Sequence, residues 1–380
     1  MVEQSGHKYK GTRGPSSRQG MGRLRRAMGK DDARQGGLER RHDDEEAMER
    51  LGDKGRASNS GASLLMKFNH LAQNTDLLAG EAGTVCGSQG QTISVRMADG
   101  NETACSMRTA LKKRIAGVKN PLCVGDTVRV APPEAEGGRP IIVAIAPRHN
   151  QLERADSHNK ALIHVFAANI DCLVVVTSMR EPDLKLGLID RYLVIAAANN
   201  IPAAVVINKA DLADTTATRA LYGALGLPVF AVVARSADGD IASLRNHLHG
   251  KICVVAGQSG VGKSSLVNAL HPGTDARIGL VADAGHGRHT TTSARGYTLP
   301  GGGILVDTPG IRECAVTGLG TLDVALLMSD LASIHHQCHF ADCSHTHEPD
   351  CAVRAAVAQG LIAVSRYENY LSIISEDLAG

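Results

Sequence analysis

The middle of the chain alternates between continuous apolar runs and amphipathic stretches. Continuous β-branched and apolar runs are typical of strands that are buried on both faces, whereas apolar residues spaced by three and four are typical of helices. Strands separated by helices imply right-handed crossovers and a parallel sheet with helices on both faces. The expected strands are 172–177, 203–207, 228–233, 252–256 and 304–306, and the expected helices are 186–198, 217–225, 241–248 and 265–270.

The patterns on either side of this region are different. Residues 83–86, 91–97 and 127–130 alternate apolar and polar positions, and 140–145 is a further apolar run. Several short strands within about 70 residues predict a small β-barrel, either an OB-fold or an SH3-like barrel. Beyond residue 322 the pattern predicts helices only. Two apolar stripes carry that prediction: Val324, Leu327, Leu331 and Ile334, then Val364, Tyr367, Leu371, Ile374 and Leu378.

The chain has 380 residues, of which 43% are hydrophobic and 21% charged, so we expect more than one globular domain. Residues 1–30 hold eight Lys or Arg against a single acidic residue, Glu3, and few large apolar side chains. Such a segment is expected to be disordered, and it either attracts polyphosphate backbones or serves as a solubilising tail. The expected domains are a basic arm (1–75), a barrel (76–150), an α/β domain (151–320) and a helical domain (321–380).

Composition excludes several function classes. Aromatic residues make up 3% of the chain and Trp is absent, so stacking on aromatic platforms is not the main mode of any nucleic-acid binding. No apolar stretch has the length of a membrane span, and the N-terminus has no signal-peptide core. The nine cysteines favour reduced thiols or metal ligands over disulfides. We expect a cytoplasmic monomer.

Residues 257–264 match the pattern G-x-x-x-x-G-K-[ST] between a predicted strand and a predicted helix. The glycines let successive backbone N–H groups surround phosphate oxygens at a helix N-terminus. Lys263 is expected to reach the β- and γ-phosphates, and the Ser264 hydroxyl to bind Mg²⁺. The expected phosphate-binding residues are Gly257, Gln258, Ser259, Gly260, Val261, Gly262, Lys263, Ser264 and Ser265.

The tetrapeptide Asn208-Lys209-Ala210-Asp211 follows the strand 203–207, at the edge where α/β sheets bind ligands. The Asp211 carboxylate can accept hydrogen bonds from the ring N–H and the exocyclic amine of guanine, which adenine does not offer. Lys209 can lie along the base, and Asn208 can join this turn to the phosphate loop. The expected substrate is therefore GTP.

Two further segments carry polar groups typical of a GTPase switch. Asp307 ends the buried run 304–306 and can hold Mg²⁺ through water, while the Gly310 N–H can meet the γ-phosphate. The Gly-rich segment 287–292 contains three threonines, of which Thr291 or Thr292 is expected to bind Mg²⁺ and the γ-phosphate.

The residue that positions the attacking water is not obvious. The place after the D-x-x-G glycine, where many GTPases carry a glutamine, holds Ile311, whose side chain neither donates nor accepts. His289 is the nearest candidate in the sequence for this role. We therefore expect slow turnover by the protein alone.

The order of these motifs is permuted. An ordinary GTP-binding domain has the phosphate loop first and N-K-x-D last, whereas here N-K-A-D precedes the phosphate loop by about 50 residues. Joining the old ends and cutting after D-x-x-G produces this order with the same strands and helices. A circular permutation leaves the site intact when the new termini lie at the surface.

Cys338, Cys343 and Cys351 fall within 14 residues, among five histidines. Three thiolates and one imidazole form a closed tetrahedral Zn²⁺ site that is structural, because no position stays open for water. Spacing alone does not choose the fourth ligand. The candidates are His335, His336, His339, His345 and His347.

Together, the permuted order, the G-R-H-T-T-T segment, D-T-P-G-I-R-E and the Cys/His cluster resemble the bacterial RsgA family (also called YjeQ or EngC) over about residues 76–380. The resemblance implies an OB-fold, a permuted GTPase domain and a helical zinc domain. It selects His345 as the fourth zinc ligand and also points to His289. The family's Ser-rich base-contacting loop falls near residues 232–236, which match it poorly, so no residue is assigned there.

The family binds the small (30S) ribosomal subunit and its rRNA late in maturation, and hydrolyses GTP to GDP and phosphate when the subunit stimulates it. Two other interpretations stay open from the residues alone. One is an RNA-binding module whose GTP site is structural and turns over little. The other is a P-loop kinase or transporter subunit that uses ATP.

Overall fold

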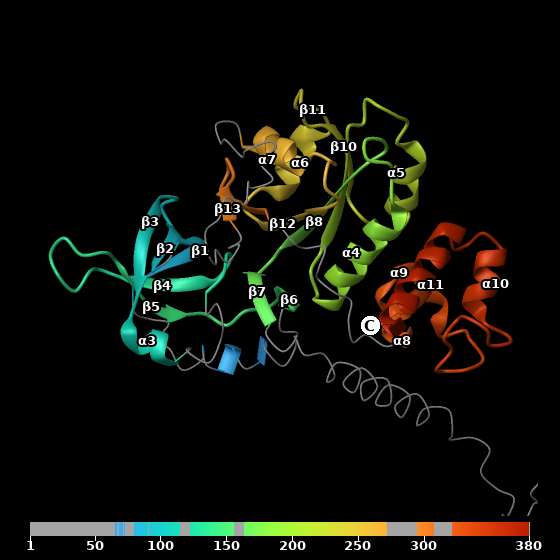
Figure 1. Ribbon diagram of the computed structural model, residues 1–380, viewed down its shortest axis with the longest axis horizontal. Helices are drawn as coiled ribbons and strands as arrows, with labels where there is room; N and C mark the ends of the chain where they lie inside the picture. The colour runs from blue at the N-terminus through green and yellow to red at the C-terminus, as the bar shows by residue number, and fades with distance from the viewer. Residues whose placement is uncertain are drawn as a thin grey trace, which may run out of the picture. The chain divides into compact units, whose positions relative to one another are not determined.

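The computed structural model describes residues 65–66, 68–70, 72, 80–89, 91–114, 122–155, 163–271, 295–307 and 321–379, which all belong to one compact unit, 54–380. Figure 1 shows three kinds of structure in it: a β-barrel, a large sheet flanked by helices, and a group of C-terminal helices. Within the described ranges, no helix combines the length and the apolar character needed to span a bilayer.

The predicted barrel is present, and it is closed in the order β1-β2-β3-β5-β4. Its interior is filled by alternate apolar side chains, as the alternation in the sequence predicted. Strand β3 was not predicted, because Cys105 is its single buried side chain and the pattern is therefore weak. The elements are β1 (Glu81–Gln89), β2 (Thr92–Met97), β3 (Glu102–Met107), α3 (Thr109–Arg114), β4 (Thr127–Ala131) and β5 (Ile141–Ile145).

The structure describes a few residues of the expected arm, 1–75, and they belong with the barrel. Helical residues between 65 and 72 lie against the barrel, and Phe68, only 2% exposed, belongs to the barrel core. The Arg148 guanidinium lies 3.6 Å from the centre of the Phe68 ring. The Asn69 side chain donates to the Arg148 carbonyl oxygen and accepts from the Arg148 N–H. Leu65, Phe68 and Ala72 are spaced by three and four, which is a helical pattern, but the prediction assigned residues 1–75 to a basic arm and did not use it.

The large sheet has the order β11-β10-β9-β8-β12-β14-β13. Its five inner strands are parallel, as predicted, but the edge strands β11 and β13 are antiparallel and were not expected. The strands are β8 (Cys172–Ser178), β9 (Ala203–Asn208), β10 (Val229–Val233), β11 (Asp238–Gly239), β12 (Ile252–Gly257), β13 (Arg295–Thr298) and β14 (Ile304–Asp307).

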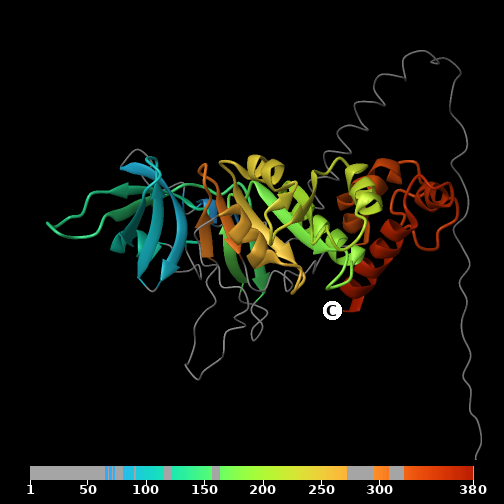
Figure 2. The same cartoon turned by 90° about the horizontal axis from the view of Figure 1, so that it is seen from above.

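Helices cover both faces of this sheet, which explains why its strands are apolar throughout (Figures 1 and 2). Alternate residues of β8 belong to different apolar clusters: Val175 packs in one with Ile189 and Tyr222, and Val174 packs in the other with Leu266. The helices are α4 (Leu186–Ala198), α5 (Thr216–Gly223), α6 (Ile241–Leu248) and α7 (Lys263–Leu270).

A short hairpin that the sequence did not predict links the barrel to the sheet. It consists of β6 (Gln151–Ala155) and β7 (Ile163–Ala168), and Ala167 of β7 forms a parallel bridge with Val124 beside the barrel. Its strands are short and mix polar with apolar residues, so they carry little alternation.

The C-terminal helices are present, but their buried faces differ from the predicted stripes. The first stripe covers two helices, because the chain is extended at Met328 (φ −96°, ψ 103°). In the last helix Val364 is 57% exposed, while Arg366, Tyr370 and Ile373 are buried. The helices are α8 (Thr321–Leu327), α9 (Ser329–His335), α10 (Ala352–Ala358) and α11 (Val364–Ala379).

Arg366 is buried because it joins α11 to two acidic residues. Its guanidinium lies 2.6 Å from the carboxylate of Asp190 in α4, and it donates two hydrogen bonds to Asp330 in α9. The amide of Asn369 and the hydroxyl of Tyr222 also donate to Asp190. Burial raises the pKa of Asp190, and the Arg366 charge opposes that shift. The network attaches the C-terminal helices to the sheet's helical layer.

Replacing Arg366 with methionine should lower the free energy of unfolding by about 3–5 kcal/mol, because the buried Asp190 and the partly buried Asp330 then lose their cation. Urea denaturation followed by circular dichroism measures this. Arg219→Met is the matched control: its ion pair with Asp240 is half exposed and should contribute at most about 1 kcal/mol. Equal midpoints for the two variants would show that the buried pair does not stabilise the fold.

Candidate nucleotide and metal sites

The carboxyl ends of the parallel strands bring the predicted nucleotide motifs to one edge of the sheet. Strand β9 ends at Asn208, β12 ends at Gly257, and β14 ends at Asp307. Only β8 separates β9 from β12, so the N-K-A-D turn lies one strand away from the phosphate loop. The two motifs therefore lie near each other despite the permuted order, as the sequence predicted.

The phosphate loop needs glycine at two positions for steric reasons. Gly257 has φ 150°, and a Cβ there would lie 2.2 Å from the Val176 carbonyl oxygen. Gly262 has φ 91°, and a Cβ there would lie 2.3 Å from the Asn208 side-chain nitrogen. Both contacts come from neighbouring strands of the sheet. The glycines thus allow the loop to pack against β8 and β9.

Lys263 is held within this loop. Its ammonium donates hydrogen bonds to the carbonyl oxygens of Gly257 (3.0 Å) and Gln258 (2.9 Å). Ser264 and Ser265 follow in the first turn of α7 and are partly exposed. A cation and a helix N-terminus at the same place form a binding site for an anion such as phosphate.

Asp307 lies on the strand next to the phosphate loop. It pairs in register with Val255 of β12. Burial raises the pKa of Asp307, and the positive charge of Lys263 opposes this shift. A carboxylate beside the phosphate loop is suited to hold the metal of a metal–phosphate group.

Asn208 connects the N-K-A-D turn with two other segments. It is 2% exposed; its amide nitrogen donates to the Val261 carbonyl oxygen (2.8 Å), and its amide oxygen accepts from the Ala234 N–H (3.0 Å). The first bond is the connection to the phosphate loop that the sequence suggested. The second brings the segment 232–236 to the site through backbone atoms. No residue type signals such a contact, so the sequence could not reveal it.

The rest of the turn presents its side chains outward. Lys209 has a left-handed backbone (φ 56°), and its ammonium donates to the Glu181 carbonyl oxygen. Asp211 is exposed, and so are Ser259 and Gly260 on the phosphate loop. These side chains are accessible to a ligand at this edge of the sheet.

Four of the predicted residues lie outside the described ranges. They are His289, Thr291, Thr292 and Gly310. Their roles remain predictions.

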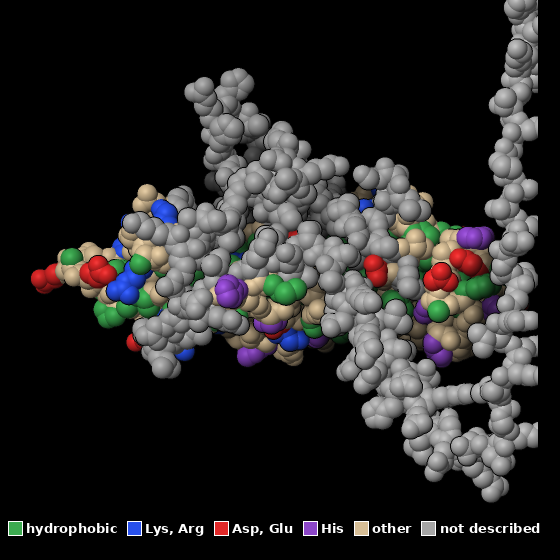
Figure 3. All heavy atoms as spheres, turned by 90° about the horizontal axis from the view of Figure 1, so that it is seen from below, with side chains coloured by type: hydrophobic (Ala, Val, Ile, Leu, Met, Phe, Trp, Pro, Cys, Tyr) green, Lys and Arg blue, Asp and Glu red, His purple; other side chains and the backbone are tan. Residues whose placement is uncertain are grey.

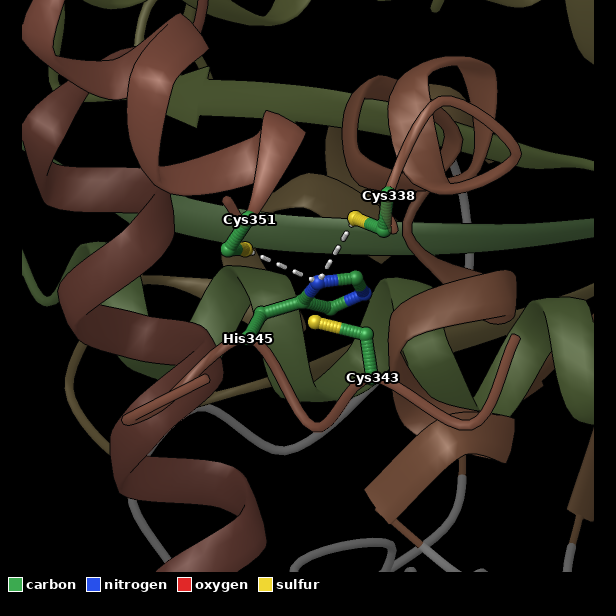
Figure 4. A group of neighbouring side chains, drawn as sticks. All are labelled: Cys338, Cys343, His345 and Cys351. Atoms are coloured by element: carbon green, nitrogen blue, oxygen red, sulfur yellow. Dashed lines mark hydrogen bonds between the residues drawn. The ribbon is translucent and has the colours of Figure 1, made fainter. Parts of the chain in front are cut away.

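The structure brings together Cys338, Cys343, His345 and Cys351, whose ligand atoms all lie within 4.8 Å of one another (Figure 4). The Nδ1 atom of His345 is 3.6 Å from the Cys338 sulfur and 3.4 Å from the Cys351 sulfur. Ligands of a tetrahedral zinc ion are separated by about 3.5–3.8 Å, given the usual Zn–N and Zn–S distances. The spacing and the soft donors of this group therefore fit a metal ion such as zinc.

Helix α11 and one carboxylate hold the loop that carries these ligands. His345 has a left-handed backbone (φ 59°), and its carbonyl oxygen accepts from the Tyr367 hydroxyl (2.7 Å). The Tyr370 hydroxyl donates to the carbonyl oxygen of Ser344 (2.7 Å). The Glu348 carboxylate accepts from backbone N–H groups in the same loop, and hydrogen bonds from the Ser344 side chain and from these N–H groups lower its pKa. The ligands are thus positioned by contacts that do not involve a metal.

The protonation tendencies of the cluster agree with metal binding. Burial lowers the pKa of His345 to about 4, so its imidazole is neutral near pH 7 and offers a lone pair. Burial, with neighbouring thiols, raises the pKa of Cys343 to about 12. A divalent cation must displace these thiol protons in order to bind, which is the usual behaviour of thiolate sites.

The other histidines of this region do not join the cluster. His335 contacts the far nitrogen of His345, and His336, His339 and His347 are exposed. Figure 3 shows histidine side chains at the surface of the C-terminal helical region. Within the described ranges, only the Cys338–Cys343–His345–Cys351 group gathers three or more such ligand atoms.

Comparison with known proteins gives consistent results. The model of the RsgA GTPase family matches residues 145–317. A small ribosomal subunit biogenesis GTPase RsgA from Porphyromonas gingivalis strain W83 is 36% identical over 307 residues, which is 78% of this chain and 97% of the relative. One of the same name from Gemmatimonas aurantiaca is 38% identical over 298 residues, covering 77% and 96%.

Two solved structures have a similar fold. YjeQ from Thermotoga maritima has a TM-score of 0.65 and 32% identity, over 79% of this chain and 99% of that protein. YloQ, described as a circularly permuted GTPase, has a TM-score of 0.63 and 23% identity, over 79% and 95%. The predicted fold class is thus confirmed: an OB-like barrel, a permuted α/β GTPase domain and C-terminal helices with a Cys/His cluster. Because the two relatives and YjeQ each match more than three quarters of its length, the chain belongs to the RsgA family of GTPases.

Proposed function

We propose that this protein is a GTPase that binds the small ribosomal subunit and acts in its late maturation, hydrolysing GTP to GDP and phosphate when the subunit stimulates it. The GTP-binding part of this proposal is supported by the hydrogen bond from Asn208 to Val261, which joins the N-K-A-D turn to the phosphate loop. The relatives' name, small ribosomal subunit biogenesis GTPase, supplies the partner.

Different residues at the carboxyl edge of the sheet bind the phosphates, the guanine base and Mg²⁺ in this proposal. The backbone N–H groups of the loop 257–264 and the Lys263 ammonium bind the phosphates, while Asp211 binds the guanine edge. Ser264 and Asp307 hold Mg²⁺, the first directly and the second through water. Thr291 or Thr292 and Gly310 contact the γ-phosphate in this proposal.

We expect the subunit to stimulate GTP hydrolysis because the chain lacks the glutamine that positions the attacking water in many GTPases. Ile311 occupies the place where many GTPases carry that residue, so the free protein turns over slowly. We assign the positioning of water to His289. A partner that stabilises the transition state accelerates GTP hydrolysis by about 10³–10⁵-fold.

The remaining regions provide contacts and support. We assign a structural Zn²⁺ to the Cys/His cluster, because four protein ligands leave no position for a reacting water. The barrel and the basic arm contact rRNA, and their Lys and Arg side chains are attracted to its phosphate backbone without stacking on its bases. The working division of the chain remains 1–75, 76–150, 151–320 and 321–380, and the protein acts as a cytoplasmic monomer.

The test measures GTP and xanthosine triphosphate (XTP) turnover with and without purified small subunits. The subunits should accelerate GTP hydrolysis by the wild type. Asp211→Asn should weaken GTP binding about 10- to 100-fold and favour XTP, whose 2-oxo group suits an amide donor. Asp214→Asn is the control, since that exposed carboxylate lies three residues beyond Asp211 and accepts from the N–H and hydroxyl of Thr216 at the start of α5.

Three outcomes would contradict the proposal. Turnover that does not respond to subunits indicates an RNA-binding module with a structural GTP site. Affinity for ATP that equals or exceeds the affinity for GTP indicates a P-loop kinase or transporter subunit. Unchanged base preference in Asp211→Asn removes this carboxylate from the guanine site.

A further inference from the structure

We propose that His335 is a positioning residue of the metal site: it accepts a hydrogen bond from the Nε2–H of His345 and thereby directs Nδ1 of His345 to the metal. This inference rests on the zinc assignment made under the proposed function. It adds to the cluster a side chain that contacts no metal but determines how one ligand is presented.

The two nitrogens of His345 face different partners. Nδ1 lies 3.6 Å from the Cys338 sulfur and 3.4 Å from the Cys351 sulfur, so this nitrogen points to the centre of the cluster (Figure 4). Nε2 lies 3.0 Å from Nδ1 of His335. The two rings are nearly perpendicular (86°), with centroids 5.1 Å apart. His335 therefore meets His345 on the side that faces away from the three thiols.

The chemistry of neutral imidazole determines the direction of this bond. A histidine that ligates a metal through Nδ1 keeps its hydrogen on Nε2, and His345 is 0% exposed, so water does not reach that N–H. A buried N–H without an acceptor is costly, and ligating histidines ordinarily donate theirs to a neighbouring group. Nδ1 of His335 is the acceptor at hydrogen-bond distance, which places the hydrogen of His335 on its own Nε2.

His335 is well placed to act as a fixed acceptor. It is the last residue of α9, and Asp330 in the same helix is bound to Arg366 of α11. Tyr367 of α11 holds the backbone of His345 through its carbonyl oxygen. One helix thus orients the ring of His345 and the other holds its backbone, and the two helices are joined by an ion pair.

This arrangement also explains why His335, a candidate zinc ligand by its spacing, is not part of the ligand set. Nδ1 of His335 faces Nε2 of His345, whereas the sulfurs of Cys338 and Cys351 lie near the other nitrogen of the His345 ring. The role of His335 depends on the lone pair of its Nδ1 atom. A substituted side chain that keeps a hydrogen-bond acceptor at this position should therefore preserve the function of His335.

The experiment uses the full-length zinc-loaded protein and measures zinc affinity by competition with a chromogenic chelator. His335→Phe keeps a ring but removes the acceptor, and should weaken zinc binding about 10- to 100-fold. His335→Gln restores an acceptor and should recover most of the affinity. The control is His336→Phe, the adjacent exposed histidine, which should bind zinc like the wild type.

A second measurement reports the bond itself. In ¹⁵N-histidine spectra of the zinc-loaded wild type, His345 should carry its proton on Nε2 and its metal on Nδ1. The His345 Nε2–H signal should shift or exchange faster in His335→Phe and recover in His335→Gln.

Each outcome has a separate meaning. If wild-type protein binds no zinc, the metal assignment of the proposed function fails. If it binds zinc but His335→Phe stays within twofold of the wild type, this inference is overturned while the zinc site stands. Equal losses in His335→Phe and His335→Gln, or metal on Nε2 of His345, would likewise overturn it.

Discussion

Replacing Lys263 with alanine should lower kcat for subunit-stimulated GTP hydrolysis about 100- to 1,000-fold, the usual effect of removing a charge that stabilises the transition state. Two carbonyl oxygens of the phosphate loop already hold the Lys263 ammonium at the N-terminus of α7. Its charge also acts on Asp307, the proposed partner of Mg²⁺. A single substitution therefore removes the cation from both the phosphates and the metal-binding carboxylate.

The measurement is phosphate release under saturating GTP and small subunits. Lys251→Ala is the matched control, because Lys251 immediately precedes the same strand, β12, at the end opposite to the phosphate loop. The control should hydrolyse GTP at the wild-type rate. Hydrolysis by Lys263→Ala within a few-fold of the wild type would show that residues 257–264 are not the catalytic phosphate loop.

Replacing Cys351 with alanine should abolish stoichiometric zinc binding and lower the stability of the C-terminal helices. Structural zinc sites contribute about 10–16 kcal/mol of apparent binding free energy, most of which depends on a complete set of ligands. Cys351 is also the N-cap of α10, where its sulfur accepts from the Arg354 N–H. The loss therefore affects the metal and the start of a helix together.

Metal analysis should find one zinc per chain in the wild type and much less in Cys351→Ala, with a reduced helical signal in circular dichroism. Cys105→Ala is the control, since Cys105 is buried in the barrel and belongs to no ligand group. That variant should keep its zinc. Full zinc occupancy of Cys351→Ala after dialysis against a chelator would contradict the assignment.

Several elements could be predicted because their pattern is local. The ranges predicted for α4 and α6, 186–198 and 241–248, coincide with the observed helices, and each central parallel strand differs from its predicted range by one residue. Long apolar periodicity is a strong signal when an element is buried against its neighbours. The antiparallel edge strand β13 was missed, since four residues with one glycine carry no clear alternation.

Part of the candidate nucleotide site could be predicted from short motifs and not from periodicity. The phosphate loop and the N-K-A-D turn are contiguous motifs whose chemistry requires particular residue types at fixed spacing. The contact from Ala234 to Asn208 uses a backbone N–H, which every residue except proline possesses. No sequence pattern identifies such a residue, and only the pairing of β9 with β10 brings it to the site.

By itself, the sequence determined the kinds of domain, the permuted order of the nucleotide motifs and the three cysteines of the metal cluster, because each depends on residues close together in the chain. Tertiary structure alone decided that Phe68 docks on the barrel, that Arg366 is buried and that His335 faces His345. Those contacts join separate segments, as Asn369 and Asp190 do across 179 positions. Burial and hydrogen-bond geometry select such partners only after the elements have packed.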